Sequence, residues 1–266
     1  MYSSGIDLGG TNIAVGIVDA EYRIVKKESI PTRAKREADA ITADIAALCL
    51  KLMEEAGLSR EDVAFAGMAT PGTANSASGV IEYANNLPFY MYPMSEKLSS
   101  LLGGIKVYIE NDANAAAWGE AIAGAAKGTS DSIMITLGTG VGGGTLLGLS
   151  KKMLGMDNIE HIENLAKDGN LSHIDLKIND LTKAAIVPGF SDTMTGSNFG
   201  NVSDIATKAD IALGVINLVF ETIGMVSVFA ARNHDLTDVV LTGNLTTVER
   251  APEVFGTLNK MFHMNF

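Results

Sequence analysis

The sequence predicts an α/β protein in which helices flank a mixed β-sheet. Short apolar runs bounded by turn-forming residues alternate with longer segments of helical periodicity. The N-terminal elements follow the order strand, strand, strand, helix, strand, which is typical of a mixed sheet. Hydrophobic residues make up 47% of the 266 positions, which is enough for one large core or two smaller ones.

The first half of the chain contains the elements of one such domain. Two apolar runs flank the turn Gly-Gly-Thr-Asn, and this pattern predicts a β-hairpin. A helix is predicted where apolar residues recur every three or four positions ahead of Gly57. The predicted strands are 3–8, 13–19, 22–30, 64–69 and 105–110, and the predicted helices are 37–56 and 111–128. We therefore expect a first domain over residues 1–128.

The second half starts a new unit at the turn Gly-Thr-Ser-Asp, so we expect a second domain over residues 129–266. A buried strand runs into a glycine-rich turn, and two helical segments and a second strand follow. The predicted strands are 132–137 and 238–244, the glycine-rich turn is 138–145, and the helices are 146–168, 204–231 and 248–263. Residues 169–203, which include Pro188, are expected to form a loop with short helical pieces.

Charge and cysteine content exclude several classes of function. The formal net charge is −11, which argues against a general binder of nucleic acid or anionic membranes. Cys49 is the only cysteine, so neither an intramolecular disulfide nor a cysteine-based zinc site can form. The N-terminal sequence lacks the pattern of a signal peptide, and no apolar run of about 18 residues is free of polar residues or glycine. We expect a cytoplasmic protein.

The turn between the first two strands has the composition of a phosphate-binding loop. Gly9 and Gly10 allow close approach of the backbone to a ligand, and their amides can point at phosphate oxygens. Thr11 adds a hydroxyl donor, and Asn12 completes the turn. Asp7, at the end of the strand, is placed to hold a hydrated Mg²⁺ near the phosphates. A plain tight hairpin turn is the alternative.

A second turn of this kind follows the strand 132–137. Its glycines and hydroxyls are Gly138, Thr139, Gly140, Gly142, Gly143, Gly144 and Thr145. Two strand-to-turn anion sites, one in each half, can together hold the triphosphate of one nucleotide. The pair predicts ATP binding more strongly than either turn alone.

Two polar residues follow the predicted strand 105–110. Asn111 and Asp112 stand at the start of an Ala-rich helix, where Asp112 is a candidate helix N-cap. The functional alternative makes Asp112 a general base that accepts a proton from a substrate hydroxyl attacking a γ-phosphoryl group. Asn111 would then hydrogen-bond a neighbouring hydroxyl. Both roles can coexist.

Five segments of the first half resemble the ROK family of sugar kinases, and especially its bacterial glucokinases. They are DLGGTN, GMATPG, NNLP, ENDANAAAWGE and ITLGTGVGGG, and the resemblance covers about residues 2–144. It implies an actin-like (ribonuclease H-like) ATPase fold of two related α/β domains with ATP in the cleft. It also implies that Asp112 is the catalytic base, that Asn86 and Asn111 contact the sugar, and that the two Gly/Thr turns hold ATP.

The second half departs from that family. The Glu-x-Gly-His sugar-binding motif and the cysteine-rich zinc loop do not follow the glycine run. Instead, residues 142–155, 195–202 and 229–245 resemble type II pantothenate kinases, and this resemblance covers about residues 138–266. It implies that the turn at Gly243 and Asn244 lies beside the adenosine.

The chain therefore resembles two kinases of one superfamily joined at Gly-Thr-Gly-Val-Gly-Gly-Gly. We expect an engineered or recombined chimera with a truncated or rearranged second domain, and a natural minimal kinase is the alternative. Three functions remain open: ATP-dependent phosphotransfer to a hexose, pantothenate kinase activity, and a catalytically inactive nucleotide-binding scaffold. The apolar helix 209–231 suits a homodimer contact, with a buried core helix as the alternative.

Overall fold

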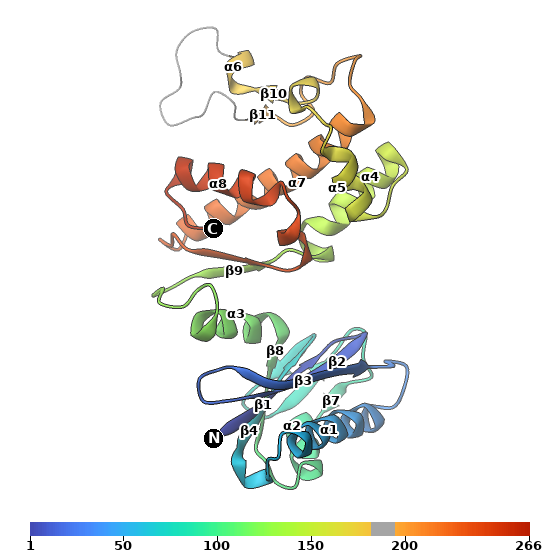
Figure 1. The fold of residues 1–266 in the computed structure, drawn as a ribbon, viewed down its shortest axis with the longest axis vertical. Helices are drawn as coiled ribbons and strands as arrows, with labels where there is room; N and C mark the ends of the chain where they lie inside the picture. The colour runs from blue at the N-terminus through green and yellow to red at the C-terminus, as the bar shows by residue number, and fades with distance from the viewer. Residues whose placement is uncertain (182–194) are drawn as a thin grey trace. The chain divides into compact units, whose positions relative to one another are not determined.

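A computed structural model of the chain describes residues 1–181 and 195–266 (Figure 1). Pro188, which was predicted to lie in a loop, falls outside the described residues. The chain divides into two compact units, Met1–Lys127 and Gly128–Phe266, called unit 1 and unit 2 below.

Unit 1 is built on a five-stranded mixed sheet in the order β3-β2-β1-β4-β8. The strands are β1 (Tyr2–Leu8), β2 (Asn12–Val18), β3 (Ile24–Pro31), β4 (Val63–Thr70) and β8 (Val107–Asn111). β1, β2 and β3 pair antiparallel, which confirms the predicted hairpin, whereas β1, β4 and β8 run parallel. The carboxyl ends of the three parallel strands consequently meet at one edge of the sheet.

Helices α1 (Ala38–Glu55) and α2 (Met94–Leu101) pack against one face of this sheet. Alternate residues of the strands, such as Ile6, Ile13 and Met68, point into the core beneath these helices. The matching buried positions on the helices include Ile45 and Leu98, both with no exposed surface. Burial of this apolar face is what fixes the register of the strands.

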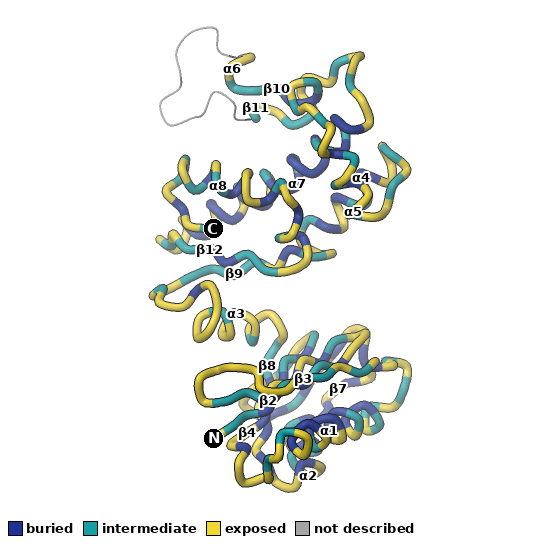
Figure 2. Tube along the Cα trace, viewed as in Figure 1, coloured by how far each residue is buried: buried dark blue, intermediate teal, exposed yellow. Residues whose placement is uncertain are grey.

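A small antiparallel sheet and one further helix complete unit 1. The small sheet consists of β5 (Thr73–Asn75), β6 (Val80–Tyr83) and β7 (Tyr90–Tyr92), none of which was predicted. Helix α3 (Asp112–Ala123) follows β8 and ends at Gly124, earlier than predicted. None of its residues is buried, and Figure 2 shows most of the helix exposed.

In the described part of unit 2, two parallel strands pair, β9 (Ile133–Thr136) and β12 (Val239–Thr242). The helices are α4 (Gly144–Leu154), α5 (Ile159–Ala166), α6 (Ile178–Leu181), α7 (Lys208–Arg232) and α8 (Ala251–Phe262). A second pair of short strands, β10 (Leu176–Lys177) and β11 (Thr195–Ser197), is antiparallel. The helix predicted over 146–168 is two helices, because Gly155 adopts a left-handed conformation with φ 73° that ends α4.

Helix α7 is the centre of unit 2. It contacts α4, α5 and α8, and its buried residues include Val215, Phe220 and Ile223. Of the helices that the structure describes, only α7 is long and apolar enough to cross a membrane, with a mean hydropathy of 2.0 over its most apolar window. Because 61% of that window is buried inside the protein, α7 is placed as a core helix of a folded unit.

Candidate functional site

The turn between β1 and β2 has free backbone donors. The Gly9 N–H donates to the Asn12 carbonyl at 2.9 Å, and the Thr32 hydroxyl donates to the Gly9 carbonyl at 2.7 Å. The N–H groups of Gly10 and Thr11 donate to no other group in residues 1–181 and 195–266. These two donors are available to an anion. Sequence reasoning missed Thr32, a fully buried residue directly after β3 whose hydroxyl fixes the turn.

Asn86 lies beside this turn. A Cβ atom built on Gly10 would come within 3.7 Å of the Asn86 Cβ, although the two residues are far apart in the sequence. The Asn86 residue is exposed. The predicted phosphate turn and one predicted sugar contact are therefore neighbours.

Two carboxylates meet at the carboxyl edge of the sheet. Asp7 lies on β1 and Asp112 is the first residue after β8, so the parallel strands deliver both to the same edge. Partial burial, and then the nearby Asp112 carboxylate, raise the pKa of Asp7. The two like charges are thus close enough to repel each other.

The N-cap of α3 is Asn111, so the alternative that made Asp112 the cap is wrong. The Asn111 Oδ1 accepts from the N–H groups of Ala113 and Asn114 at 3.0 and 3.3 Å, and its Nδ2 donates to the Gly72 carbonyl at 3.0 Å. An amide nitrogen carries two N–H groups, so one of them remains for a ligand. Because Asn111 caps the helix, Asp112 is not needed for that purpose.

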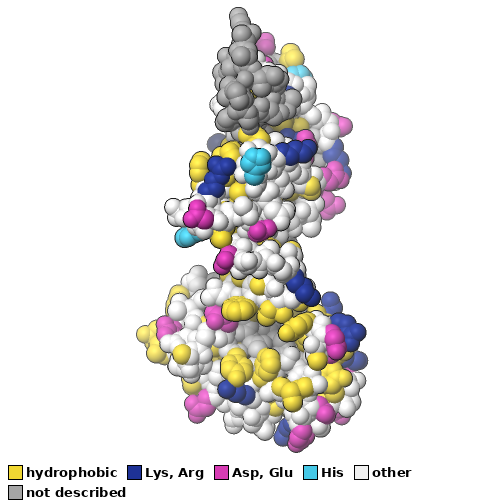
Figure 3. Space-filling model, turned by 90° about the vertical axis from the view of Figure 1, so that its left-hand side faces the viewer, with side chains coloured by type: hydrophobic (Ala, Val, Ile, Leu, Met, Phe, Trp, Pro, Cys, Tyr) yellow, Lys and Arg dark blue, Asp and Glu magenta, His cyan; other side chains and the backbone are white. Residues whose placement is uncertain are grey.

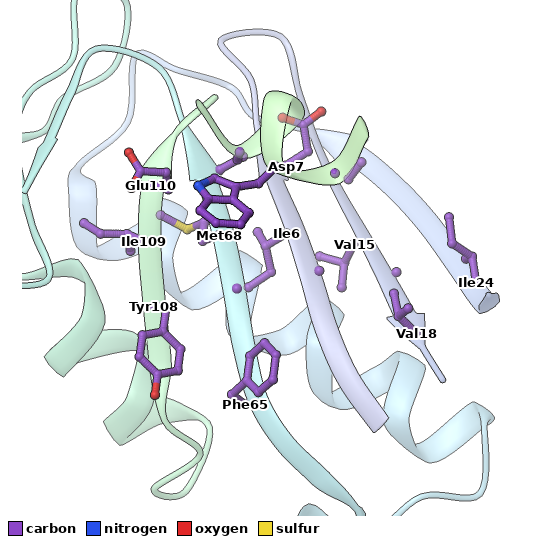
Figure 4. Close-up of a pocket in the computed structure, with 18 of the residues that line it drawn as sticks. Ile6, Asp7, Val15, Val18, Ile24, Phe65, Met68, Tyr108, Ile109 and Glu110 are labelled. Carbon is purple, nitrogen blue, oxygen red and sulfur yellow. The ribbon is translucent and has the colours of Figure 1, made fainter. Parts of the chain in front are cut away.

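Glu110 supports this arrangement, and sequence reasoning gave it no role. Its carboxylate accepts from the Ser76 hydroxyl at 2.7 Å, from the Asn114 Nδ2 at 3.0 Å and from the Asn111 N–H at 2.9 Å. These hydrogen bonds, led by that from Ser76, lower the pKa of Glu110. Figure 4 shows Glu110 and Asp7 at the same end of one sheet face. A glutamate directly before Asn-Asp at a strand end was the available sequence signal.

The predicted nucleotide turns of unit 2 also lie together. β9 and β12 are parallel neighbours, so the turn after each strand leaves from the same edge. The Leu137 N–H donates to the Thr242 carbonyl at 2.6 Å, and the Thr136 and Thr242 hydroxyls are 3.1 Å apart. The turn 138–145 is therefore adjacent to Gly243 and Asn244.

The backbone conformation of these turns requires glycine at several positions. Gly142 and Gly243 have φ angles of 90° and 95°, a region that residues with side chains rarely adopt. A Cβ on Gly243 would lie 2.4 Å from the Leu137 carbonyl oxygen, and one on Gly144 would lie 2.8 Å from the Thr139 carbonyl oxygen. Helix α4 begins at Gly144 directly after a π-helical turn over Thr139–Gly143, in which the N–H groups of Gly143 and Gly144 donate to the carbonyls of Gly138 and Thr139.

The predicted site residues thus form one group within each unit. Unit 1 brings together Asp7, Gly9, Gly10, Thr11, Asn12, Asn86, Asn111 and Asp112. Unit 2 brings together Gly138, Thr139, Gly140, Gly142, Gly143, Gly144, Thr145, Gly243 and Asn244.

The carboxylates of unit 1 fit a magnesium ion. No cluster of three or more His, Cys, Asp or Glu side chains suited to a metal occurs in the residues that the structure describes. Mg²⁺ is commonly held by one or two carboxylates together with waters and substrate phosphates. Burial and, after it, the Asp112 carboxylate raise the pKa of Asp7, and a cation near both carboxylates would offset the second of these effects.

Two family models match the chain. The ROK family model matches residues 3–158, and the model named Fumble matches residues 127–264. The glucokinase of Streptomyces coelicolor is 40% identical over 146 residues, which are 54% of this chain and 43% of that protein. The type II pantothenate kinase of Staphylococcus saprophyticus is 35% identical over 111 residues, 40% of this chain and 42% of that protein. Each alignment thus spans less than half of the curated relative.

One relative aligns with both units. An uncharacterized protein of Clostridium perfringens is 28% identical over 233 residues, 81% of this chain and 76% of that protein. An alignment of that extent includes residues from unit 1 and unit 2. The resemblance to both families is confirmed, while a recombined or engineered origin is not confirmed and stays a prediction.

Solved structures share the fold. A ROK glucokinase of Streptomyces griseus, in complex with glucose and AMPPNP, has a TM-score of 0.63 at 19% identity and covers all of this chain and 91% of that one. A ROK family protein of Streptococcus pneumoniae has a TM-score of 0.69 at 16% identity and covers 97% and 86%. The predicted actin-like α/β fold is therefore correct. The chain belongs to the ROK family through residues 3–158 and to the Fumble family through residues 127–264.

Proposed function

We propose that the chain is an ATP-dependent kinase that transfers the γ-phosphoryl group of ATP to a hydroxyl of a hexose such as glucose. The observation that carries this proposal is the carboxylate pair Asp7 and Asp112, set beside a turn with two free backbone donors. The similarity of residues 3–158 to the ROK family, and the glucokinases among the relatives, support the choice of acceptor.

Asp112 acts as the general base. Its carboxylate accepts the proton of the sugar hydroxyl while that oxygen bonds to the γ-phosphorus, and the bond from the γ-phosphorus to the bridging oxygen breaks to release ADP. Asn111 fixes the start of α3, which sets the position of Asp112, and its second amide N–H can bind a neighbouring hydroxyl. Asn86 binds another sugar hydroxyl.

The remaining site residues bind the nucleotide. In unit 1, the free N–H groups of Gly10 and Thr11 are the proposed donors to phosphate oxygens. In unit 2, the neighbouring turns at 138–145 and 243–244 are the proposed contacts to phosphate and adenosine. Asp7 would hold a hydrated Mg²⁺, which neutralises phosphate charge when it is bound. Asp7 would then keep its carboxylate ionised despite the neighbouring Asp112.

Coupled ADP release with Mg²⁺-ATP tests the proposal. Glucose, mannose, N-acetylmannosamine, pantothenate and no acceptor are compared, with Asp112→Asn as the matched control. We expect hexose-dependent turnover that falls about 10²- to 10⁴-fold in the variant, the range for loss of a general base. Equal turnover in Asp112→Asn would refute the role of Asp112.

Pantothenate kinase activity is the second candidate. It is favoured by the similarity of the second half to a type II pantothenate kinase. Pantothenate-dependent ADP release in the same assay would select it over the hexose kinase. The absence of turnover with every acceptor, together with retained nucleotide binding, would select the inactive scaffold.

A further inference from the structure

Helix α3 carries the proposed general base at its first residue, Asp112, but it is not part of the apolar core of unit 1. None of its residues, all of which the structure describes, is buried or belongs to that core. A hollow of about 910 Å³ is lined both by the strands of the sheet and by Ala115, Trp118 and Gly119 of α3. Figure 3 shows hydrophobic side chains gathered around a hollow on one face of unit 1. The first turn of α3 therefore depends on hydrogen bonds for its position more than on apolar packing.

The Glu110 carboxylate, at the end of β8, joins three segments of the chain at this point (Figure 4). Its Oε1 accepts from the Asn111 N–H at 2.9 Å and from the Nδ2 of Asn114, in the first turn of α3, at 3.0 Å. Its Oε2 accepts from the hydroxyl of Ser76, in the turn between β5 and β6, at 2.7 Å. Because these hydrogen bonds lower the pKa of Glu110, with Ser76 contributing most, the carboxylate is ionised at neutral pH and can only accept. Both of its oxygens are thus used to hold neighbouring segments.

The N-cap of α3 connects Glu110 to Asp112. The Ala113 N–H lies 3.0 Å from the Asn111 Oδ1 and 2.9 Å from the Asp112 Oδ1, so the cap and the proposed general base share one donor. Glu110 in turn holds the backbone N–H of Asn111. A displacement of Asn111 therefore changes the hydrogen bonding of the Asp112 carboxylate. Glu110 can act on Asp112 by this route, through the residue that stands between them.

We propose that Glu110 and Ser76 are positioning residues, and that their hydrogen bond fixes the start of α3 in the orientation in which Asp112 meets the sugar hydroxyl. This inference rests on the proposed function, because it gives the two residues a part in the same site.

The role of Glu110 is geometric, and a glutamine can reproduce it. The glutamine side chain has nearly the same size, and its carbonyl oxygen can accept from Asn111 and Asn114. Its amide nitrogen can donate to the Ser76 hydroxyl, which can accept as well as donate. Glu110→Gln should therefore keep α3 connected to the β5–β6 turn, whereas Glu110→Ala removes all three hydrogen bonds. The two variants separate the position of the side chain from its charge.

Steady-state kinetics of the full chain with glucose and Mg²⁺-ATP test the proposal. Glu110→Ala should lower kcat/KM for glucose about 10- to 100-fold, because a displacement of about 1 Å at the reacting group can cost about 10²-fold. Glu110→Gln should stay within about threefold of the natural chain, and the KM for ATP should change less than about twofold in either variant. Ser76→Ala should lower kcat/KM less than Glu110→Ala does. It should have no further effect in the Glu110→Ala background, because the two residues act through one hydrogen bond.

The matched control is Glu82→Ala. Glu82 stands on β6 and accepts from the Asn75 Nδ2 at 3.1 Å, so it is a hydrogen-bonded glutamate of the small sheet that is not joined to α3 by that bond. Its kinetic constants should equal those of the natural chain. The proposal would be overturned if Glu110→Ala kept full activity, if Glu110→Gln lost as much as Glu110→Ala, or if Glu82→Ala lost as much as either. If urea unfolding shows that Glu110→Ala does not fold, Ser76→Ala decides.

Glucose binding, measured by isothermal titration calorimetry without ATP, separates this inference from the proposed function. Because Asn111 is proposed to bind a sugar hydroxyl, Glu110→Ala should raise the dissociation constant for glucose about tenfold, and Glu110→Gln should leave it nearly unchanged. If the natural chain binds glucose but releases no ADP, the kinase proposal fails, and the dissociation constants of the two variants decide on Glu110. A natural chain that neither binds nor phosphorylates a hexose would overturn both.

Discussion

The two units build their candidate sites from different parts of the polypeptide. In unit 1 the site depends on side chains, Asp7 and Asp112, delivered by the ends of parallel strands. In unit 2 it depends on backbone, because Gly142 and Gly243 hold conformations and close contacts that a side chain would prevent. Substitution in unit 1 should therefore remove chemistry and spare the fold, whereas substitution in unit 2 should damage the fold itself.

The sharpest test of the side-chain site is Asp112→Asn. We expect hexose-dependent kcat to fall about 10²- to 10⁴-fold, since the general base is lost. The free energy of unfolding should not fall, because Asn111 caps α3 and removal of one charge relieves the repulsion on Asp7. Steady-state kinetics and urea unfolding measure the two effects. If Asp112→Asn were inactive because it is unfolded, the contrast between a side-chain site in unit 1 and a backbone site in unit 2 would be wrong.

The backbone site is tested by Gly243→Ala. The residue has φ 95°, and its new Cβ would lie 2.4 Å from the Leu137 carbonyl oxygen. Strain and overpacking together should lower the free energy of unfolding by about 2–5 kcal/mol. The control is Gly148→Ala in α4, where a Cβ meets nothing within 4 Å, and it should be neutral or stabilise by about 0.5–1 kcal/mol. Equal effects at the two glycines, measured by urea unfolding, would contradict the argument.

Unit 2 has a buried group of hydrogen-bonded polar side chains. A substitution there should lower the free energy of unfolding more than the loss of a buried hydroxyl in unit 1. Asn217 is fully buried, donates to the Asp175 carboxylate at 3.1 Å and accepts from the Arg250 guanidinium at 3.0 Å. Asn217→Leu leaves both charged groups without this partner, and we expect a loss of about 2–4 kcal/mol. Thr42→Val in unit 1, which removes a hydroxyl shared with Tyr92, should lose about 1 kcal/mol. Urea midpoints that rank the two variants in the opposite order would refute this comparison.

The smallest expected effects concern pH, and they have opposite signs in the two units. Burial acts to raise the pKa of Asp210, but hydrogen bonds from Thr207, Asn170 and His173 outweigh it, so the pKa lies well below its ordinary value of 3.8. The ionised Asp210 therefore stabilises the folded state above pH 3.8, and this stabilisation is lost as the pH falls from 3.8 through the lower pKa of the folded state. Asp210→Asn should lose about 1 kcal/mol at neutral pH, as for a lost helix cap, and less in acid.

Asp7 should behave in the opposite way. Because its pKa is raised, the protonated form is favoured in the folded chain, and that stability is lost as the pH rises through the folded pKa. Asp7→Asn should therefore stabilise unit 1 at neutral pH, by less than about 1 kcal/mol after solvent screening. The difference from the natural chain should vanish in acid. Urea unfolding at several pH values measures both variants, and slopes of the same sign would contradict the assignment.

Strands and helices could be predicted from the sequence where the pattern of apolar residues was long and uninterrupted. The hairpin around Gly9, the helix before Gly57 and the strand ahead of Gly138 all follow from apolar runs bounded by glycine turns. The candidate site residues were equally visible, because Asp7 lies just before the turn at Gly9, and Asn111 and Asp112 stand at the end of the apolar segment 105–110. Local sequence is enough for prediction where the residues of one strand or helix specify both that element and the turn next to it.

The remainder depends on contacts between distant segments. The strands of the small sheet in unit 1 are three or four residues long, too short for a period to show. Thr32 supports the turn at Gly9 from the segment after β3, and the Gly72 carbonyl group accepts a hydrogen bond from Asn111, so neither role is visible in the local sequence. The row formed by Gly16, Gly5 and Gly67 across three neighbouring strands was not predicted either, because only the register of these strands aligns the glycines.

The pairing of β9 with β12 also sets the order of events during synthesis. Thr136 and Thr242 are paired although 106 residues separate them, whereas Leu8 pairs with Ile13 across a single turn. At about 5–20 residues per second, a ribosome needs on the order of 5–20 s to make the segment between them. Throughout that time β9 has no β12 to pair with, while the strands of unit 1 are already complete. Slower translation between these strands should therefore lengthen the exposure of β9 to aggregation or chaperones, without affecting the sheet of unit 1.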